Sequence, residues 1–98
     1  MLASFSVVPF GVGEELKEYV ADVIRIIDAS GLEYRLGAME TTVEGDPAEV
    51  WNVIRKCHER MRELSPRVLT HVAIDDRMAA KGRLTGKVED VKMILGKV

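Results

Sequence analysis

The stretch METTVEGDPAEV, from Met39 to Val50, decides the fold because a strand ends and a helix begins within it. Asp46 suits the N-cap position, Pro47 the first helical position, and Glu49 the third, from which its side chain can reach back to the cap. Before this signal, a short strand is predicted to end at Glu44. A strand would usually carry an apolar or neutral residue there, so the sequence raises the question of what this carboxylate does.

The pattern extends outward from this junction in both directions. Apolar residues recur with a period of two in the predicted strands and on one helical stripe in the predicted helices. Glycines and prolines stand between these segments, which is typical of turns and helix ends. The predicted elements are strands over residues 2–8, 33–36, 40–44 and 68–75, helices over residues 14–30 and 47–64, a polar mobile segment over 75–87, and a short C-terminal helix from about residue 87.

The order of these elements is β-α-β-β-α-β followed by a tail. This order predicts a ferredoxin-like α+β fold, which is a four-stranded antiparallel sheet with strand order 4-1-3-2 and both main helices on one face. A chain of 98 residues supports one hydrophobic core, so residues 1–98 are predicted to form a single domain.

Composition excludes several classes of protein. The net charge is −2 and only 5% of the residues are aromatic, so neither phosphate neutralisation nor base stacking favours a nucleic-acid partner. No apolar run approaches the roughly 20 residues that a membrane span needs. The N-terminus lacks the pattern of a secretory signal, and the single cysteine, Cys57, cannot form an internal disulfide. We therefore expect a cytoplasmic protein with no membrane partner.

Strand alternation predicts a polar surface on the sheet face that the two helices leave open. Four apolar residues of the same face suggest partial burial by a second subunit, although plain exposure to water would also explain a polar open face. Glu44 would belong to this polar surface and not to the core. The predicted polar residues are Ser4, Ser6, Arg35, Thr42, Glu44, His71 and Asp75, and the apolar ones are Leu2, Val8, Leu69 and Ala73.

Three short motifs give the chain a resemblance to a known family. They are GLEY at Gly31–Tyr34, TTVEG at Thr41–Gly45 and IDDR at Ile74–Arg77, and their order and spacing cover nearly the whole chain. In these respects the sequence resembles a family of small proteins that was long catalogued as uncharacterised and was later described as thiamine-binding.

The resemblance implies a ferredoxin-like domain that forms dimers or tetramers through its sheets. It also implies a non-catalytic pocket for thiamine or its hydroxymethylpyrimidine moiety, with thiamine as a bound ligand and no other cofactor. We expect this pocket on the open sheet face, at the interface with a second subunit. The family's usual Gly-Thr-Gly after the first strand is Gly11-Val12-Gly13 here, which argues against phosphate binding by that loop. Motif match gives Met39, Thr42, Glu44 and Asp75 as ligand-binding residues, and the predicted open face adds Ser6 and His71.

Thiamine is a cation with a flat aminopyrimidine ring. A carboxylate could pair with its amino group or balance its charge, hydroxyl groups could form hydrogen bonds, and a methionine could lie against a ring face. Two other functions fit the same sequence. A small dimeric enzyme could use His71, Glu44 or Asp75 as general acid or base, and a structural or regulatory oligomerisation domain would need none of them.

No catalytic or metal-binding residue is assigned from the sequence. Cys57 and His58 are adjacent, but both lie within a predicted helix, where Cys57 occupies the apolar stripe and is expected to be buried. The chain also lacks the closely spaced ligands of a dedicated zinc site.

Overall fold

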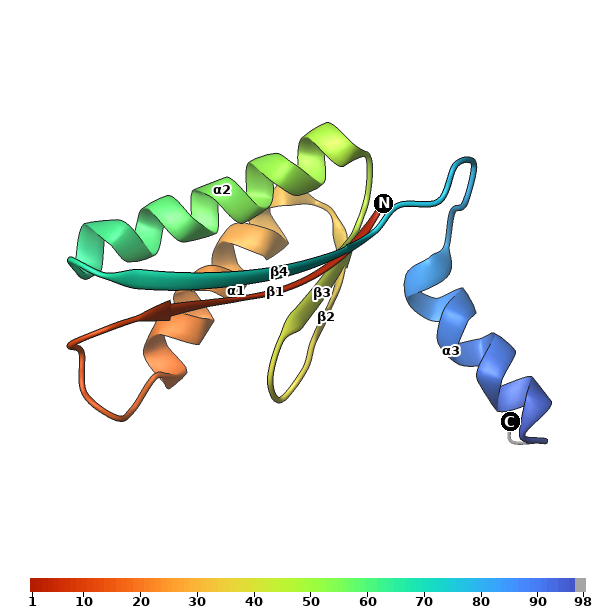
Figure 1. Cartoon of the computed structure of the whole chain (residues 1–98), viewed down its shortest axis with the longest axis horizontal. Coiled ribbons are helices and arrows are strands. Elements are labelled where there is room, and N and C mark those ends of the chain that lie inside the picture. The colour runs from red at the N-terminus through yellow and green to blue at the C-terminus, as the bar shows by residue number, and fades with distance from the viewer. Residues whose placement is uncertain (97–98) are drawn as a thin grey trace.

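The computed structural model describes residues 1–96 and has the predicted order of elements. One four-stranded antiparallel sheet with strand order β2-β3-β1-β4 carries α1 and α2 on one face (Figure 1). The ferredoxin-like prediction is therefore confirmed. The elements are β1 (Leu2–Pro9), α1 (Lys17–Ser30), β2 (Glu33–Leu36), β3 (Thr41–Glu44), α2 (Pro47–Leu64), β4 (Val68–Asp75) and α3 (Arg83–Ile94).

The core lies between the sheet and the two covering helices. Alternate residues of β1 and β3 point into it, and Phe5 and Val43 are almost completely buried there. Cys57 is fully buried among them, as its place on the apolar stripe of α2 predicted. The buried core residues are Ala3, Phe5, Val23, Ile27, Val43, Val50, Val53, Ile54, Cys57 and Met61.

The ends of the first two helices differ in how well the sequence located them. α2 begins at Pro47 with Asp46 as N-cap, although the Asp46 side chain forms no capping hydrogen bond. α1 begins at Lys17 and not at residue 14, because its first hydrogen bond runs from the Val20 N–H to the Leu16 carbonyl at 2.9 Å. Gly31 ends α1 in the left-handed conformation, with φ of 77°.

Gly45 sits where the chain passes from β3 to α2. A Cβ atom at this position would lie 2.6 Å from Cδ2 of Leu32, which is closer than real Cβ contacts come. Glycine therefore leaves room for the Leu32 side chain, which lies between α1 and β2, to pack against the chain after β3.

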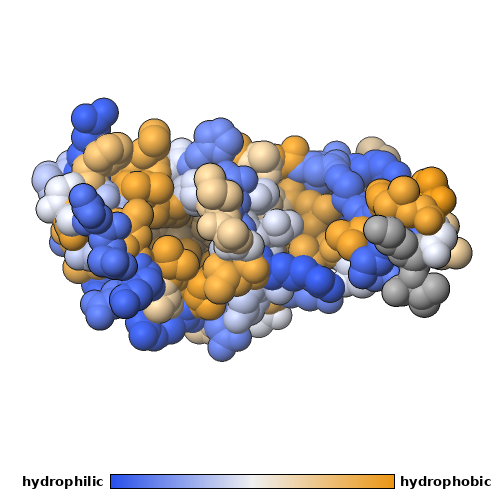
Figure 2. All heavy atoms as spheres, turned by 90° about the horizontal axis from the view of Figure 1, so that it is seen from below, coloured by the Kyte–Doolittle hydropathy of each residue, from blue (hydrophilic) through white to orange (hydrophobic). Residues whose placement is uncertain are grey.

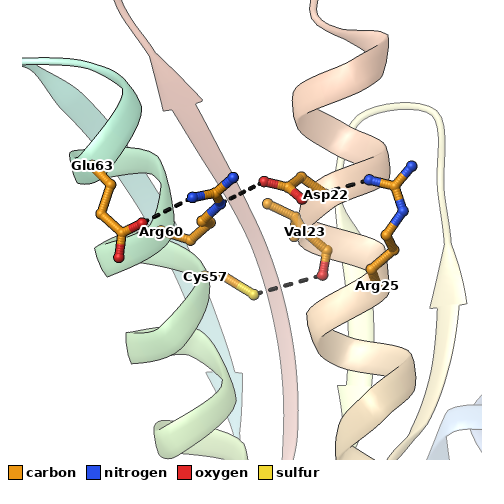
Figure 3. A network of polar contacts seen from close by, with 6 residues as sticks. All are labelled: Asp22, Val23, Arg25, Cys57, Arg60 and Glu63. Carbon is orange, nitrogen blue, oxygen red and sulfur yellow. Dashed lines mark hydrogen bonds and ion pairs between the residues drawn. The ribbon is translucent and has the colours of Figure 1, made fainter.

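A polar network ties α1 to α2 at the surface (Figure 3). Arg60 of α2 donates from Nε to Asp22 of α1 at 2.7 Å and from Nη1 to Glu63 at 2.9 Å, and Arg25 approaches Asp22 at 3.5 Å. Below this network, the buried Cys57 thiol lies 3.8 Å from the Val23 carbonyl oxygen. Exposed pairs of this kind contribute little stability, so the network orients the two helices and does not hold the fold together.

The third helix departs from the sequence prediction. α3 begins at Arg83 and not near residue 87, so part of the segment expected to be mobile is helical. It projects away from the body on the side opposite α1 and α2 (Figure 1). Among the helices of the described residues, none combines the length and the hydropathy that crossing a membrane requires.

Candidate functional site

The strand register confirms which residues share the open face of the sheet. Ser4 lies opposite Thr42 on β3, and Ser6 lies opposite His71 on β4. Leu2 lies between Glu44 and Asp75 at the other end of the same face. The predicted polar residues of the open face therefore do lie on one surface, but they follow its length and do not meet at a single point.

The Glu44 end of the open face is occupied by α3. The Glu44 carboxylate accepts hydrogen bonds from the backbone N–H groups of Arg83, at 2.8 Å, and of Leu84, at 3.1 Å. The Asp75 carboxylate accepts from Lys87 Nζ at 2.6 Å, and this ammonium lowers the pKa of Asp75. Glu44 thus caps the first turn of α3, where free N–H groups and the helix dipole favour a negative charge.

Farther along the open face, near the middle of β1, lies a second carboxylate, Glu40, which the sequence prediction missed. Its Oε2 accepts from the Ser4 hydroxyl at 2.9 Å, and its Oε1 lies 3.1 Å from Nδ1 of His71. The hydrogen bond from Ser4, followed by that from His71, lowers the pKa of Glu40. Glu40 is therefore ionised near neutral pH and orients His71, whose side chain is largely exposed. The alternation of strand residues that placed Thr42 and Glu44 on the open face also indicates Glu40.

A hollow opens beside Glu40, at the tip of the β2–β3 hairpin. β3 pairs only with residues 2–5 of β1, whereas β4 pairs with all of residues 2–9. Within residues 1–96, the edge of β1 from Ser6 to Pro9 therefore has no strand partner on the hairpin side. The hairpin turn and the first part of α1 close this space, which has a volume of about 280 Å³. We call it the hairpin hollow.

The hairpin hollow has mostly apolar walls, and Figure 2 shows it from the hairpin side with apolar side chains around its mouth. Tyr19 and Val20 of α1 line one wall, and Met39 lies on the turn at the other. Ser6 and Glu40 supply polar groups at the rim. The backbone of β1 adds others, because alternate residues of an antiparallel strand direct their N–H and C=O groups toward the same side.

A second depression, the α3 groove, lies between the open face and α3. It has a volume of about 420 Å³, and Thr42 and Leu84 are among its apolar and hydroxyl-bearing lining residues. Arg35, Arg83 and Lys87 also line it. Asp75 lines it too and pairs with Lys87, and Arg83 pairs with Asp90, so charges of both signs surround the groove.

The six predicted site residues therefore fall into separate places. Ser6 and Met39 line the hairpin hollow. His71 lies on the open face between the two ends and contacts Glu40. Thr42 and Asp75 line the α3 groove, and Glu44 caps α3 beside it. Among residues 1–96, no group of three or more histidine, cysteine, aspartate or glutamate side chains is placed to hold a metal ion.

The chain is thus a ferredoxin-like α+β domain with a small, largely apolar hollow and a few polar lining residues. Comparison with known proteins then gives the family. Residues 3–92 match the family model described as thiamine-binding protein, and the chain belongs to this family.

Curated relatives match over almost the whole chain. A UPF0045 protein from Mycobacterium bovis is 38% identical over 96 residues, which is 97% of this chain and 94% of the relative. A UPF0045 protein from Bacillus subtilis is 34% identical and covers 92% of both chains.

Solved structures show the same fold. A hypothetical protein from Methanocaldococcus jannaschii superimposes with a TM-score of 0.85 at 26% identity, covering 92% of this chain and 93% of that one. A Thermotoga maritima protein described as a candidate thiamine biosynthesis or salvage protein superimposes with a TM-score of 0.80 at 24% identity, covering 92% and 96%.

Proposed function

We propose that the protein binds thiamine or a related hydroxymethylpyrimidine compound, without catalysis, in the hairpin hollow. The observation that carries this proposal is the hollow itself, where apolar walls meet an unpaired stretch of strand edge and Glu40 is among the lining residues. Membership of the thiamine-binding protein family supports the choice of ligand.

The size of the hollow favours the pyrimidine part of the ligand. Small-molecule pockets usually have volumes of about 300–1,000 Å³, and the hollow, at about 280 Å³, is at the lower limit. A flat six-membered ring fits such a space, with the thiazolium ring of thiamine extending past the turn. Met39 is 89% exposed on that turn and could cover the protruding ring with its thioether.

The polar groups of the hollow match the edge of an aminopyrimidine. Such a ring presents an amino donor beside a ring-nitrogen acceptor. On the hairpin side, the free edge of β1 offers the Val7 N–H as donor and the Val7 and Pro9 carbonyls as acceptors for that pair, because Pro9 has no N–H and the even-numbered residues face β4. The Glu40 carboxylate retains lone pairs beyond its contacts with Ser4 and His71, and it can accept from the amino group or balance the thiazolium charge.

The hollow fits this ligand better than the surface around Glu44 does. Both Glu44 oxygens already accept backbone N–H groups, and Asp75 is paired with Lys87. A ligand at that end would have to displace these contacts and approach basic side chains. This comparison moves the proposed contact from Glu44 to Glu40.

Calorimetric titration with thiamine and with hydroxymethylpyrimidine tests the assignment. Glu40→Gln should weaken binding at least tenfold because it removes the carboxylate charge, and Val20→Trp should abolish binding because it fills the hollow from α1. Glu44→Gln is the matched control at the far end of β3 and should bind as the wild type does. Equal affinity in all variants, or a loss confined to Glu44→Gln, would show that the hollow is not the site.

A further inference from the structure

Three side chains on the open face of the sheet form a hydrogen-bonded cluster around Glu40. Its Oε2 accepts from the Ser4 hydroxyl at 2.9 Å, and its Oε1 lies 3.1 Å from Nδ1 of His71. Ser4 belongs to β1, His71 to β4, and Glu40 directly precedes β3. Paired strands therefore hold the three residues in place, and we call them the Glu40 cluster.

The order of the groups within the Glu40 cluster shows what they do. In a nucleophilic triad, the imidazole lies between the hydroxyl and the carboxylate and takes the hydroxyl proton. Here the carboxylate lies in the middle, and the Ser4 hydroxyl already donates to it. The cluster is therefore not arranged to activate Ser4 as a nucleophile, and what it does is fix the position of a carboxylate.

The Glu40 cluster adjoins the hairpin hollow. Glu40 lines the hollow, and so does Ser6, which lies opposite His71 in the pairing of β1 with β4. The His71 side chain is 73% exposed and the Glu40 side chain 31% exposed, so protons reach both groups from solvent. A ligand in the hollow would therefore have the Glu40–His71 pair beside it.

The net charge of this pair depends on the protonation of His71. The hydrogen bond from Ser4, followed by that from His71, lowers the pKa of Glu40, which keeps the carboxylate ionised near neutral pH. A histidine, in contrast, ordinarily changes its charge between about pH 5 and pH 8. The pair carries one negative charge while His71 is neutral and no net charge once His71 is protonated. A cation nearby is attracted in the first case only.

From this geometry we propose that His71 is a positioning residue for Glu40 and that its protonation weakens the binding of thiamine in the hairpin hollow. The inference rests on the proposed function, because it concerns the same site and the same cationic ligand. Unit charges a few ångströms apart at a protein surface change an affinity by about threefold to tenfold. Thiamine should therefore bind about threefold to tenfold more tightly at about pH 8 than at about pH 6.

The other groups that could titrate in this range lie away from the hollow. The second histidine, His58, is on α2 and has its Nδ1 2.6 Å from the Thr70 hydroxyl. The Met1 amino group donates to the Gly45 carbonyl at 3.0 Å, beyond the Glu44 end of β3. Burial raises the pKa of the Cys57 thiol to about 12.

The remaining ionisable groups that face the open face or the hollow are of types that ordinarily keep their charge between about pH 6 and pH 8. They are Arg35 of β2, Glu44 of β3, Asp75 of β4, Arg83 and Lys87 of α3, and Tyr19 of α1. A pH dependence of binding in this range is therefore assigned to His71.

Calorimetric titration of the full chain with thiamine at about pH 6 and about pH 8 tests this assignment. In His71→Gln the side-chain amide can still donate to Glu40 but cannot become charged, so the two affinities should be nearly equal. His71→Lys carries its charge at both pH values, so it should bind at both as weakly as the wild type does at the lower pH. His58→Gln is the matched control and should keep the wild-type ratio of affinities.

Comparison between variants removes the effect of protonation of the ligand itself, because every variant meets the same ligand. The proposal is overturned if the wild type binds thiamine equally well at the two pH values, or if His71→Gln keeps the wild-type ratio. A ratio that is lost only in His58→Gln would overturn it as well. Absence of thiamine binding at both pH values would be a different result, since it would refute the proposed function and this inference together.

Discussion

Removal of the Glu44 charge should detach the first turn of α3 while leaving the core of the domain folded. In Glu44→Gln, one carboxylate oxygen that accepts a backbone N–H of α3 is replaced by an amide NH2, which cannot accept it. Hydrogen bonds to a charged group contribute about 1.5–3 kcal/mol each, and a carboxylate at a helix N-terminus adds about 0.3–1 kcal/mol. Because Glu44 is only half-buried, we take about 2 kcal/mol as the total loss.

A loss of about 2 kcal/mol in the docking of α3 corresponds to roughly a thirtyfold rise in its opening equilibrium. Hydrogen exchange followed by mass spectrometry should therefore show peptides of α3 exchanging about thirtyfold faster in Glu44→Gln. Peptides of β1 and α2 should keep their protection, since the core does not include α3.

Glu33 gives a matched control for this experiment. It lies directly opposite Glu44 on β2 and is exposed, so Glu33→Gln removes a neighbouring charge of the same sign. Like charges opposite each other on two strands are unfavourable, and this variant should leave the protection of α3 unchanged or slightly raised. Equal exchange of α3 in the wild type and in Glu44→Gln would refute the capping role of Glu44.

The remaining predictions concern the core and the dependence of stability on pH. Met61 is fully buried and Met93 is 78% exposed, so Met61→Ala should lower the free energy of unfolding by about 2–5 kcal/mol and Met93→Ala by no more than about 0.5 kcal/mol in urea titrations. The folded-state pKa of Glu40 lies below its ordinary value of 4.5, so its contribution to stability is full above that pH and is lost as the pH falls through the folded pKa. Glu40→Gln should therefore flatten the fall in stability below pH 4.5, and an unchanged slope would contradict the contact with Ser4.

The parts of the structure that follow local rules could be predicted from the sequence. Strand alternation placed Ser4, Ser6, Thr42 and His71 on one face, because the period of a strand is two and its register with the next strand followed from the fold class. Asp46 and its neighbours located the start of α2 to the residue.

The parts that depend on contacts between distant segments could not be predicted in the same way. α3 begins at Arg83 because Glu44, which is 39 residues away in the sequence, caps it. The sequence near residue 83 contains no local pattern that predicts this helix start. Glu44 looked out of place at the end of a strand, and its role as the cap of α3, which follows β4, explains its position.

The hairpin hollow was missed for a related reason. It exists because β3 stops pairing after residue 5 of β1, and the length of that pairing is set by the position of the hairpin turn in three dimensions. Motif match did indicate Met39, and the predicted open face indicated Ser6, and both residues line the hollow. Motif match also indicated Glu44 and Asp75, which α3 engages.

The location of the ligand is the central claim, and amide chemical shifts of the isotope-labelled full chain measure it most directly. On addition of hydroxymethylpyrimidine, we expect the largest shift changes at Ser6–Val8 and in the turn at residues 37–40, with those at Arg83 and Leu84 unchanged. Shift changes confined to Glu44 and α3, or none at saturating ligand, would contradict the account.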